Sequence, residues 1–210
     1  MQFNIFLVIP PFAEYNIHKI KESFAGLHAG DRGDRTYTLS ERTFIMSINR
    51  VKEYFRQWNI EDRIQEFETS SATVALAAQA LGVAGQRIAK TLSFRSGDKC
   101  ILIVAAGDAK IDNSRFKAAF GMKAKMLSPE EVSHLVGHDI GGVCPFAVND
   151  TVEAVYLDES LRRFETVFPA CGNAASAIEL SCDELEKYAN ATSWVDVCKG
   201  WREEESQPES

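Results

Sequence analysis

The segment KTLSFRSGDKCILIVAA, residues 90–106, constrains the fold of this chain more than any other. Residues 90–95 and 100–106 have the composition of strands, and residues 96–99 between them have the residue types of a turn. The second run is almost entirely apolar, which is typical of a strand buried on both faces of a sheet. The sequence therefore predicts two adjacent strands, the second of them central and buried.

Helical and extended patterns are mixed around this pair of strands. Amphipathic or capped helical patterns occur at residues 40–59, 72–82, 113–121, 128–137 and 181–189. Short strand patterns occur at residues 63–68, 123–127, 154–161, 165–170, 176–181 and 193–197. Because no regular βαβ alternation connects them, we expect an α/β (mixed α+β) domain with a strongly curved mixed sheet.

The chain length favours one main domain with short additions. The chain has 210 residues, of which 45% are hydrophobic and 25% charged, as in ordinary soluble domains. Residues 1–38, with two adjacent prolines and a turn-rich end, are predicted to be an N-terminal extension. We expect the domain to occupy residues 39–200 and an acidic, disordered tail to follow at residues 201–210.

The net charge of −7 argues against nucleic-acid binding through overall charge. A local basic stretch is nevertheless present within sixteen residues, with Asp112 as its one acid. Its members are Lys110, Arg115, Lys117, Lys123 and Lys125. They form either a solvated face or a phosphate-contacting surface.

The five cysteines include no C-x-x-C pair, so free thiols in a reducing compartment are expected. The apolar N-terminal run is too short to span a bilayer and makes a poor signal peptide. A cytoplasmic protein without a membrane partner is therefore predicted.

Residues 137–146, GHDIGGVCPF, combine two adjacent glycines, a thiol and a proline without any helical or strand period. Such a segment is either a plain turn or a loop that holds a ligand by its backbone. His134 and His138 have i, i+4 spacing, but Gly137 should end the helix, so surface histidines are favoured over a metal site. Cys144 is interpreted as a pocket thiol rather than a nucleophile, because no nucleophile-elbow motif surrounds it.

Lys90 lies where a helical turn gives way to an apolar strand. A lysine at an inward-facing strand end is costly without a partner. Its side chain either reaches solvent along its aliphatic stem or acts as a fixed cation for a phosphate, a carboxylate or an oxyanion.

Three segments taken together resemble the YbaK/prolyl-tRNA-synthetase-associated editing domains, the bacterial insertion-type deacylases. They are RIAKTLSFR followed by ILIVAAGDAKID, the loop GGVCPF with its G-x-x-x-P spacing, and VYLDESL with FETVFPACGNAASAIELSCDEL. The resemblance covers residues 40–199. It implies a YbaK-like curved sheet or partial barrel surrounded by helices.

The resemblance also implies a trans-editing enzyme that hydrolyses wrongly charged aminoacyl-tRNA, often tRNA for proline carrying a small amino acid, without a metal or other cofactor. Its implied partners are the acceptor end of the tRNA and a synthetase such as prolyl-tRNA synthetase, and a monomer or homodimer is expected. Its catalytic residues would be Lys90, Gly141 and Gly142. The substrate-binding residues would be Val143, Cys144, Pro145, Phe146, Gly172 and Asn173.

Two positions depart from some relatives, which have a serine and an aspartate where this chain has Ala170 and Ala177. A thiol-directed mechanism is therefore not carried over, and Asn173 and Ser176 are the polar side chains left nearby. The alternative function is a non-catalytic module that binds a tRNA end or a synthetase. A hydrolase with Cys144 as nucleophile is a third, weaker reading.

Overall fold

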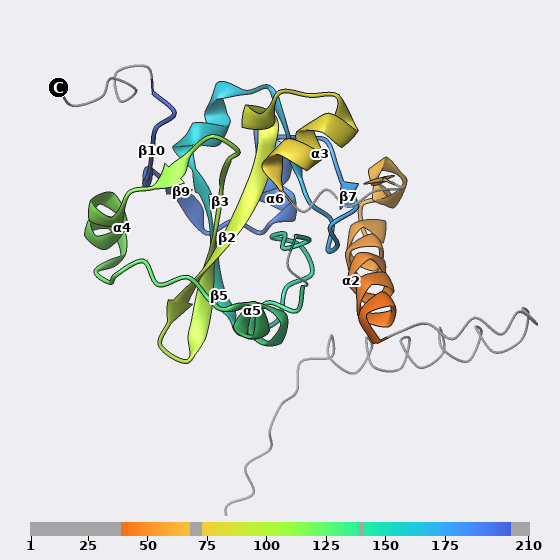
Figure 1. The fold of residues 1–210 in the computed structure, drawn as a ribbon, viewed down its shortest axis with the longest axis horizontal. Helices are drawn as coiled ribbons and strands as arrows, with labels where there is room; N and C mark the ends of the chain where they lie inside the picture. Colours follow the sequence, from red (N-terminus) through yellow and green to blue (C-terminus); the bar gives the residue numbers. More distant parts are fainter. Residues whose placement is uncertain (1–38, 68–72, 139–140, 203–210) are drawn as a thin grey trace, which may run out of the picture. The chain divides into compact units, whose positions relative to one another are not determined.

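The computed structural model describes residues 39–67, 73–138 and 141–202. Their main sheet is six-stranded, mixed and curled into a half-barrel, with the strands in the order β8, β6, β2, β3, β5, β9 (Figure 1). The bounds of these strands are β2 Ile88–Ser96, β3 Lys99–Ala106, β5 Val152–Asp158, β6 Thr166–Pro169, β8 Leu180–Ser181 and β9 Ser193–Val195. The predicted fold class is confirmed.

The β2–β3 hairpin is the centre of the sheet, as its sequence predicts. The two strands pair antiparallel from Ala89 opposite Ala106 to Ser96 opposite Lys99. Gly97 closes the turn with a φ of +56°, a conformation that glycine adopts without strain. Every residue of β3 after Lys99 is buried, because β2 and β5 flank it and side chains cover both of its faces.

Five helices are described. Their bounds are α2 Leu39–Arg56, α3 Val74–Leu81, α4 Asn113–Phe120, α5 Pro129–Leu135 and α6 Cys182–Tyr188. Both predicted capping boxes form. The hydroxyls of Ser128 and Ser181 accept from the backbone N–H of Glu131 and Glu184, and the carboxylates of these glutamates accept from the backbone N–H of the serines. Helices α3 and α4 end at left-handed Gly82 and Gly121.

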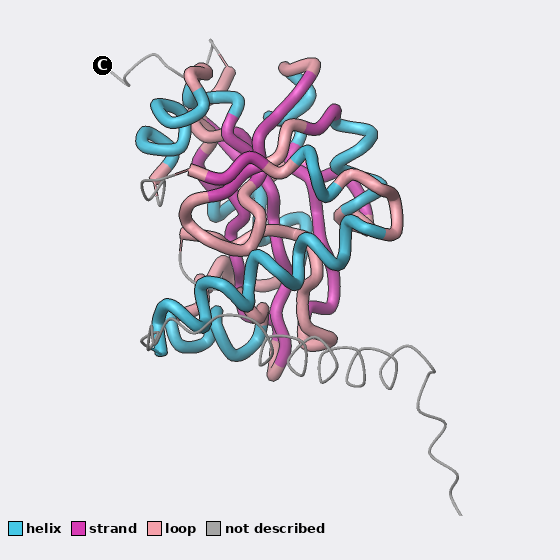
Figure 2. The backbone as a smooth tube through the Cα atoms, turned by 90° about the vertical axis from the view of Figure 1, so that its right-hand side faces the viewer, coloured by secondary structure: helices cyan, strands magenta, loops and turns pink. Residues whose placement is uncertain are grey.

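Helix α2 matters most for the site. It crosses one side of the strands, whereas α4 lies at the opposite side of the sheet (Figures 1 and 2). Ile48, Val51 and Phe55 on its inner face are buried, which confirms the predicted amphipathic pattern there. The fourth apolar residue of that pattern, Phe44, has a side chain outside the described part.

Some predicted strands are shorter than expected. Residues 123–127 make only an isolated bridge, Met126 with Phe94, because the chain crosses the hairpin edge and leaves to begin α5. Residues 176–181 divide into β7, Ser176–Ala177, and β8, because each half pairs with a different strand. Of the strand predicted at residues 63–68, the described part contains β1, Gln65–Glu66, which pairs with β7, and residue 68 lies outside the described residues.

The predicted N-terminal extension, residues 1–38, and the tail beyond Arg202 lie outside the described residues. Trp201 packs on the domain, with its Nε1 donating to the carbonyl of Cys198 at 3.2 Å. In the described ranges, no helix is both long enough and apolar enough to cross a membrane.

Candidate functional site

Two loops that are far apart in sequence meet at residues 141–146 and 170–177. A Cβ built on Gly142 would lie 2.3 Å from Asn173 Cα and 2.4 Å from Asn173 N, far inside van der Waals contact. Only glycine fits there, and the neighbouring Gly141 has a φ of +87°. The group that approaches Gly142 most closely in the folded chain is the backbone of the second loop, and the approach of a substrate to the glycine pair stays a prediction.

Helix α2 holds both loops through one residue, Ser47. Its carbonyl oxygen would be 2.6 Å from a Cβ on Gly172, so the second loop lies directly against the helix. Its hydroxyl lies 3.0 Å from His138 Nδ1 at the start of the first loop. One turn further along α2, Arg50 donates to the carbonyls of Gly137 at 3.0 Å and Ala147 at 2.5 Å. Arg50 thus holds Gly137, which precedes the first loop, and Ala147, which follows it.

His138 is the central polar residue of the first loop. Its Nε2 is 2.8 Å from the carbonyl of Phe146, which can only accept, so Nε2 carries the hydrogen and Nδ1 accepts from Ser47. The side chain is 1% exposed, and burial lowers its pKa to about 4. His138 is therefore a neutral side chain that connects Ser47 of α2 to the carbonyl of Phe146 by two hydrogen bonds. His134 lies exposed on α5, which ends at Leu135, so the two rings do not share a helix face.

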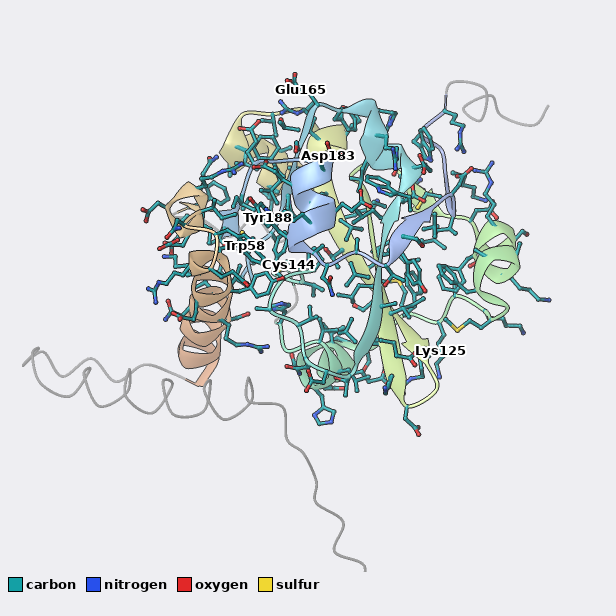
Figure 3. The ribbon with its side chains drawn as sticks, turned by 180° about the vertical axis from the view of Figure 1, so that it is seen from behind. Trp58, Lys125, Cys144, Glu165, Asp183 and Tyr188 are labelled. Carbon is teal, nitrogen blue, oxygen red and sulfur yellow. The ribbon has the colours of Figure 1, made fainter. Side chains whose placement is uncertain are left out.

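The buried side chains of Cys144 and Phe146 fix the first loop to the core. The thiol is fully buried, 3.4 Å from His138 Nε2, and burial raises its pKa to about 12, which disfavours a nucleophilic thiolate. The ring of Phe146 lies 4.7 Å from that of Phe55. Phe55 in turn packs with Tyr188 and Trp58 (Figure 3). Pro145 is also buried, and Val143 is half-buried.

The second loop is rigid around Asn173, which is 2% exposed. Asn173 Oδ1 accepts hydrogen bonds from the N–H of Ala175 at 2.9 Å and from the hydroxyl of Ser176 at 2.8 Å. The N–H of Phe67 donates to the carbonyl of Ala175 at 2.8 Å, next to the β1–β7 pairing. The strand pairing and the side-chain bonds together fix this turn.

Lys90 directly follows the last residue of β2 that pairs with β6. In that parallel pairing Ala89 lies opposite Pro169, the residue before the second loop, whereas the Lys90 side chain is held at residues 107–109. Lys90 Nζ donates to the carbonyl of Gly107 at 3.0 Å and to that of Ala109. Burial lowers its pKa, and the side chain is held rather than free in solvent. These two bonds occupy two of its three N–H donors.

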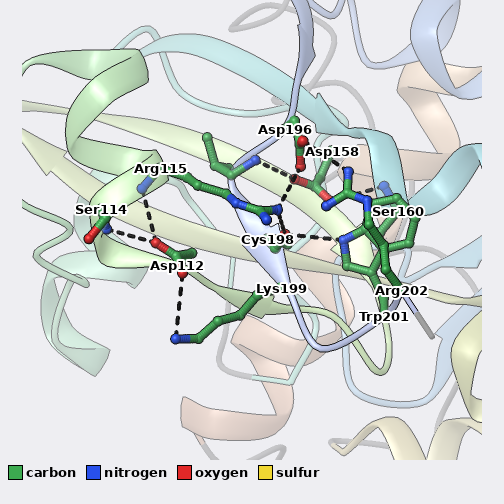
Figure 4. A network of polar contacts seen from close by, with 11 residues as sticks. Asp112, Ser114, Arg115, Asp158, Ser160, Asp196, Cys198, Lys199, Trp201 and Arg202 are labelled. Atoms are coloured by element: carbon green, nitrogen blue, oxygen red, sulfur yellow. Dashed lines mark hydrogen bonds and ion pairs between the residues drawn. The ribbon is translucent and has the colours of Figure 1, made fainter. Parts of the chain in front are cut away.

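The predicted basic stretch lies apart from the two loops. Lys110, Lys117, Lys123 and Lys125 are exposed on β4, Lys110–Ile111, on α4 and on the segment after it. Lys125 is well separated from Cys144 in Figure 3. Arg115 is half-buried and bonds Asp196 and the carbonyl of Cys198, so it fastens β10, Cys198–Lys199, to the domain (Figure 4).

A surface hollow of about 470 Å³ lies elsewhere, lined by Arg63, Gln65, Thr166 and Glu179. Arg63 binds Glu184 and the carbonyl of Glu179, and the hydroxyl of Thr166 donates to the Glu179 carboxylate. Its charged groups are thus already paired with one another. It contains none of the predicted site residues.

Sequence reasoning missed Ser47 and Arg50 and assigned His138 to the surface. The signal was available for the first two, because Ser47 and Arg50 lie one helical turn apart beside the apolar stripe of Val51. Polar side chains on the inward edge of an amphipathic helix require buried partners. The partners themselves are about 90 residues away and could not be read from the sequence.

Comparison with known proteins gives the class to which this fold and site belong. Residues 68–188 match the family described as the aminoacyl-tRNA editing domain. The match covers more than half of the chain, and the chain belongs to this family. The match begins after α2, so the helix that fastens both loops lies outside it.

Individual proteins are similar to this chain over about 70% or more of its length. YwhH of Bacillus subtilis (strain 168), itself uncharacterised, is 59% identical over 157 residues, which are 74% of this chain and 99% of YwhH. The solved structure of a proposed trans-editing enzyme for prolyl-tRNA synthetase is 28% identical, with a TM-score of 0.66 over 73% of this chain and 98% of that one. The structure of protein APE2540 is 26% identical, with a TM-score of 0.61 over 70% and 99% of the two chains.

Proposed function

We propose that this protein is an aminoacyl-tRNA deacylase that acts in trans on wrongly charged tRNA. Membership of the editing-domain family supports the reaction class. The observation that carries the proposal is the apposition of Gly142 to Asn173, which fixes the backbone of the two loops. Lys90, half-buried and bonded to the carbonyls of Gly107 and Ala109, is the fixed cation of the proposed mechanism.

The proposed chemistry asks little of the side chains. An aminoacyl ester is already activated, so a well-placed water and a stabilised oxyanion suffice. The third N–H of the Lys90 ammonium binds a phosphate oxygen of the terminal adenosine or the ester carbonyl. Backbone amides at Gly141 and Gly142 face the scissile carbonyl, and a ribose hydroxyl of the substrate orients the water.

We infer a small amino acid on tRNA for proline as substrate. The solved relative described as a proposed trans-editing enzyme for prolyl-tRNA synthetase supports the choice of tRNA. A contact with one methylene discriminates by only about 1–3 kcal/mol, so we expect several small residues to be accepted. The protein would work in the cytoplasm, alone or beside a synthetase, as a monomer or homodimer.

The proposed tRNA-binding patch is the basic stretch, of which four residues are exposed: Lys110, Lys117, Lys123 and Lys125. Lys117, Lys123 and Lys125 belong to one continuous segment, α4 and the residues that follow it, and Lys110 lies on β4 just before it. Each phosphate contact releases counterions, so tRNA affinity should weaken steeply with salt. Arg115 is already engaged with Asp196 and therefore contributes less than the sequence suggests.

The test is deacylation of a panel of tRNA for proline charged with alanine, cysteine, serine, threonine or proline. Hydrolysis of one or two non-cognate species and not of the proline species would support the proposal. Binding without hydrolysis of any species would contradict it and favour the non-catalytic binding module. Cys144→Ala should leave hydrolysis intact, because the buried thiol is not the nucleophile.

A further inference from the structure

The folded chain engages the oxygen of the Asn173 side-chain amide in hydrogen bonds but not its nitrogen. Its oxygen is identified by the backbone N–H of Ala175 at 2.9 Å, because a backbone N–H can only donate. The hydroxyl of Ser176 donates to the same oxygen. The rotamer and the flip of the amide are therefore both determined by the turn.

Asn173 Nδ2 makes no hydrogen bond within the described residues, although the residue is 2% exposed. The enclosed side-chain atoms that lack a partner in that part of the chain are Glu61 Oε2 and Thr91 Oγ1, and Nδ2 is not among them. Within that part of the chain the nitrogen is therefore not fully enclosed. Such a fixed, nearly buried donor is available to a water or to a ligand that accepts from it.

The chemistry of this group restricts what the ligand can be. Two donors already occupy Oδ1, so the side chain offers N–H groups and cannot hold the ammonium group of an aminoacyl residue. It can bind an oxygen acceptor. The backbone of the same residue contacts Gly142, so Asn173 itself belongs to the place where the two loops meet.

We propose that Asn173 Nδ2 donates a hydrogen bond to the ester carbonyl oxygen of the aminoacyl group, with Ser176 as a positioning residue. This inference rests on the proposed deacylase function. Water attacks the carbonyl carbon, the C=O electron pair moves to the oxygen, and the bond from Nδ2 strengthens as that oxygen becomes negative. The C–O bond to the ribose then breaks, and the ribose oxygen takes the proton released by the water.

The variant that tests the donor is Asn173→Asp. Aspartate keeps the shape and an oxygen that accepts from Ala175 and Ser176, and it replaces the donor with an acceptor. Loss of one oxyanion donor lowers kcat by about 10²–10³-fold, and we expect KM to change little. Asn173→Ala, which adds no charge, should show the same pattern if the aspartate variant fails to fold.

Ser176→Ala tests the positioning role, because it leaves the donor but removes one of the two hydrogen bonds that hold the amide. Losing one neutral hydrogen bond should lower kcat by about 2- to 10-fold. In the Asn173→Asp background the same change should cost no further activity, because both residues act through one donor. If both residues were merely structural, their losses of kcat would add in the double variant, and each loss would be accompanied by a lower Tm.

The outcomes separate this inference from the proposed function. A wild-type protein that hydrolyses the panel and an Asn173→Asp variant with unchanged kcat would overturn the inference and leave the deacylase standing. A wild-type protein that hydrolyses no species would overturn both. A large loss of kcat with unchanged KM and Tm would support the inference.

Discussion

Gly142→Ala is the substitution whose effect the structure determines most closely. The added Cβ would lie 2.3–2.5 Å from three backbone atoms of Asn173. Ordinary contact begins at about 3.4 Å, so the two loops must separate by about 1 Å, and no side chain can rotate to relieve the contact. The φ of Gly142 is not in the left-handed region, so the collision alone accounts for the effect.

The expected magnitude has two parts. Overpacking of this kind lowers the free energy of unfolding by about 1–3 kcal/mol. A displacement of about 1 Å between groups that position a substrate lowers kcat by about 10²-fold. Urea denaturation measures the first part, and single-turnover deacylation measures the second.

The matched control is Gly85→Ala. Its Cβ would lie 3.6 Å from Val74 Cγ1, which is ordinary contact, and its φ is also outside the left-handed region. The control should keep wild-type stability or gain slightly. A Gly142→Ala protein with wild-type stability and activity would refute the reasoning. Lost activity at unchanged stability would mean that the added methyl group collides with the substrate and not with the backbone of Asn173.

Three further predictions concern other parts of the site. Burial holds the pKa of His138 in the folded protein near 4, whereas its ordinary value is 6.5, so the unfolded state binds the proton more tightly. The free energy of unfolding should therefore fall by about 3 kcal/mol as the pH drops from 6.5 to 4. Urea denaturation of His138→Gln should lack this pH dependence, whereas the variant of the exposed histidine, His134→Gln, should keep it. Iodoacetamide should not modify Cys144 in the folded protein at pH 7.5, since burial raises the pKa of its thiol to about 12, and rapid alkylation detected by mass spectrometry would contradict its placement. Changing Lys117, Lys123 and Lys125 together to alanine should reduce the slope of log K against log[salt] for tRNA by about 2–3, and an unchanged slope would locate the tRNA elsewhere.

Local sequence patterns predicted the elements that carry their own signals. The sequence predicted three kinds of feature, because each depends on residues within one element. These are the apolar run of β3, the two capping boxes, and the glycines that end α3 and α4. The strand lengths at residues 123–127 and 176–181 were not, since pairing partners far along the chain set them.

The site was predictable to a similar degree. The glycine pair and Lys90 stood out as residues that are costly without a structural reason. What the sequence could not show is that Gly142 is pressed against Asn173 and that α2 fastens both loops through Ser47. These are contacts between segments 31 to 125 residues apart, and no local period records them.

Lys90 provides the most direct test of the central claim. Single-turnover deacylation of alanyl-tRNA for proline should be compared for the wild type, for Lys90→Met and for Lys99→Met, which changes an exposed lysine at the far end of the same hairpin. The account predicts a rate about 10²–10³-fold lower for Lys90→Met alone, with the folded state verified by urea denaturation. Equal rates for all three proteins would contradict it.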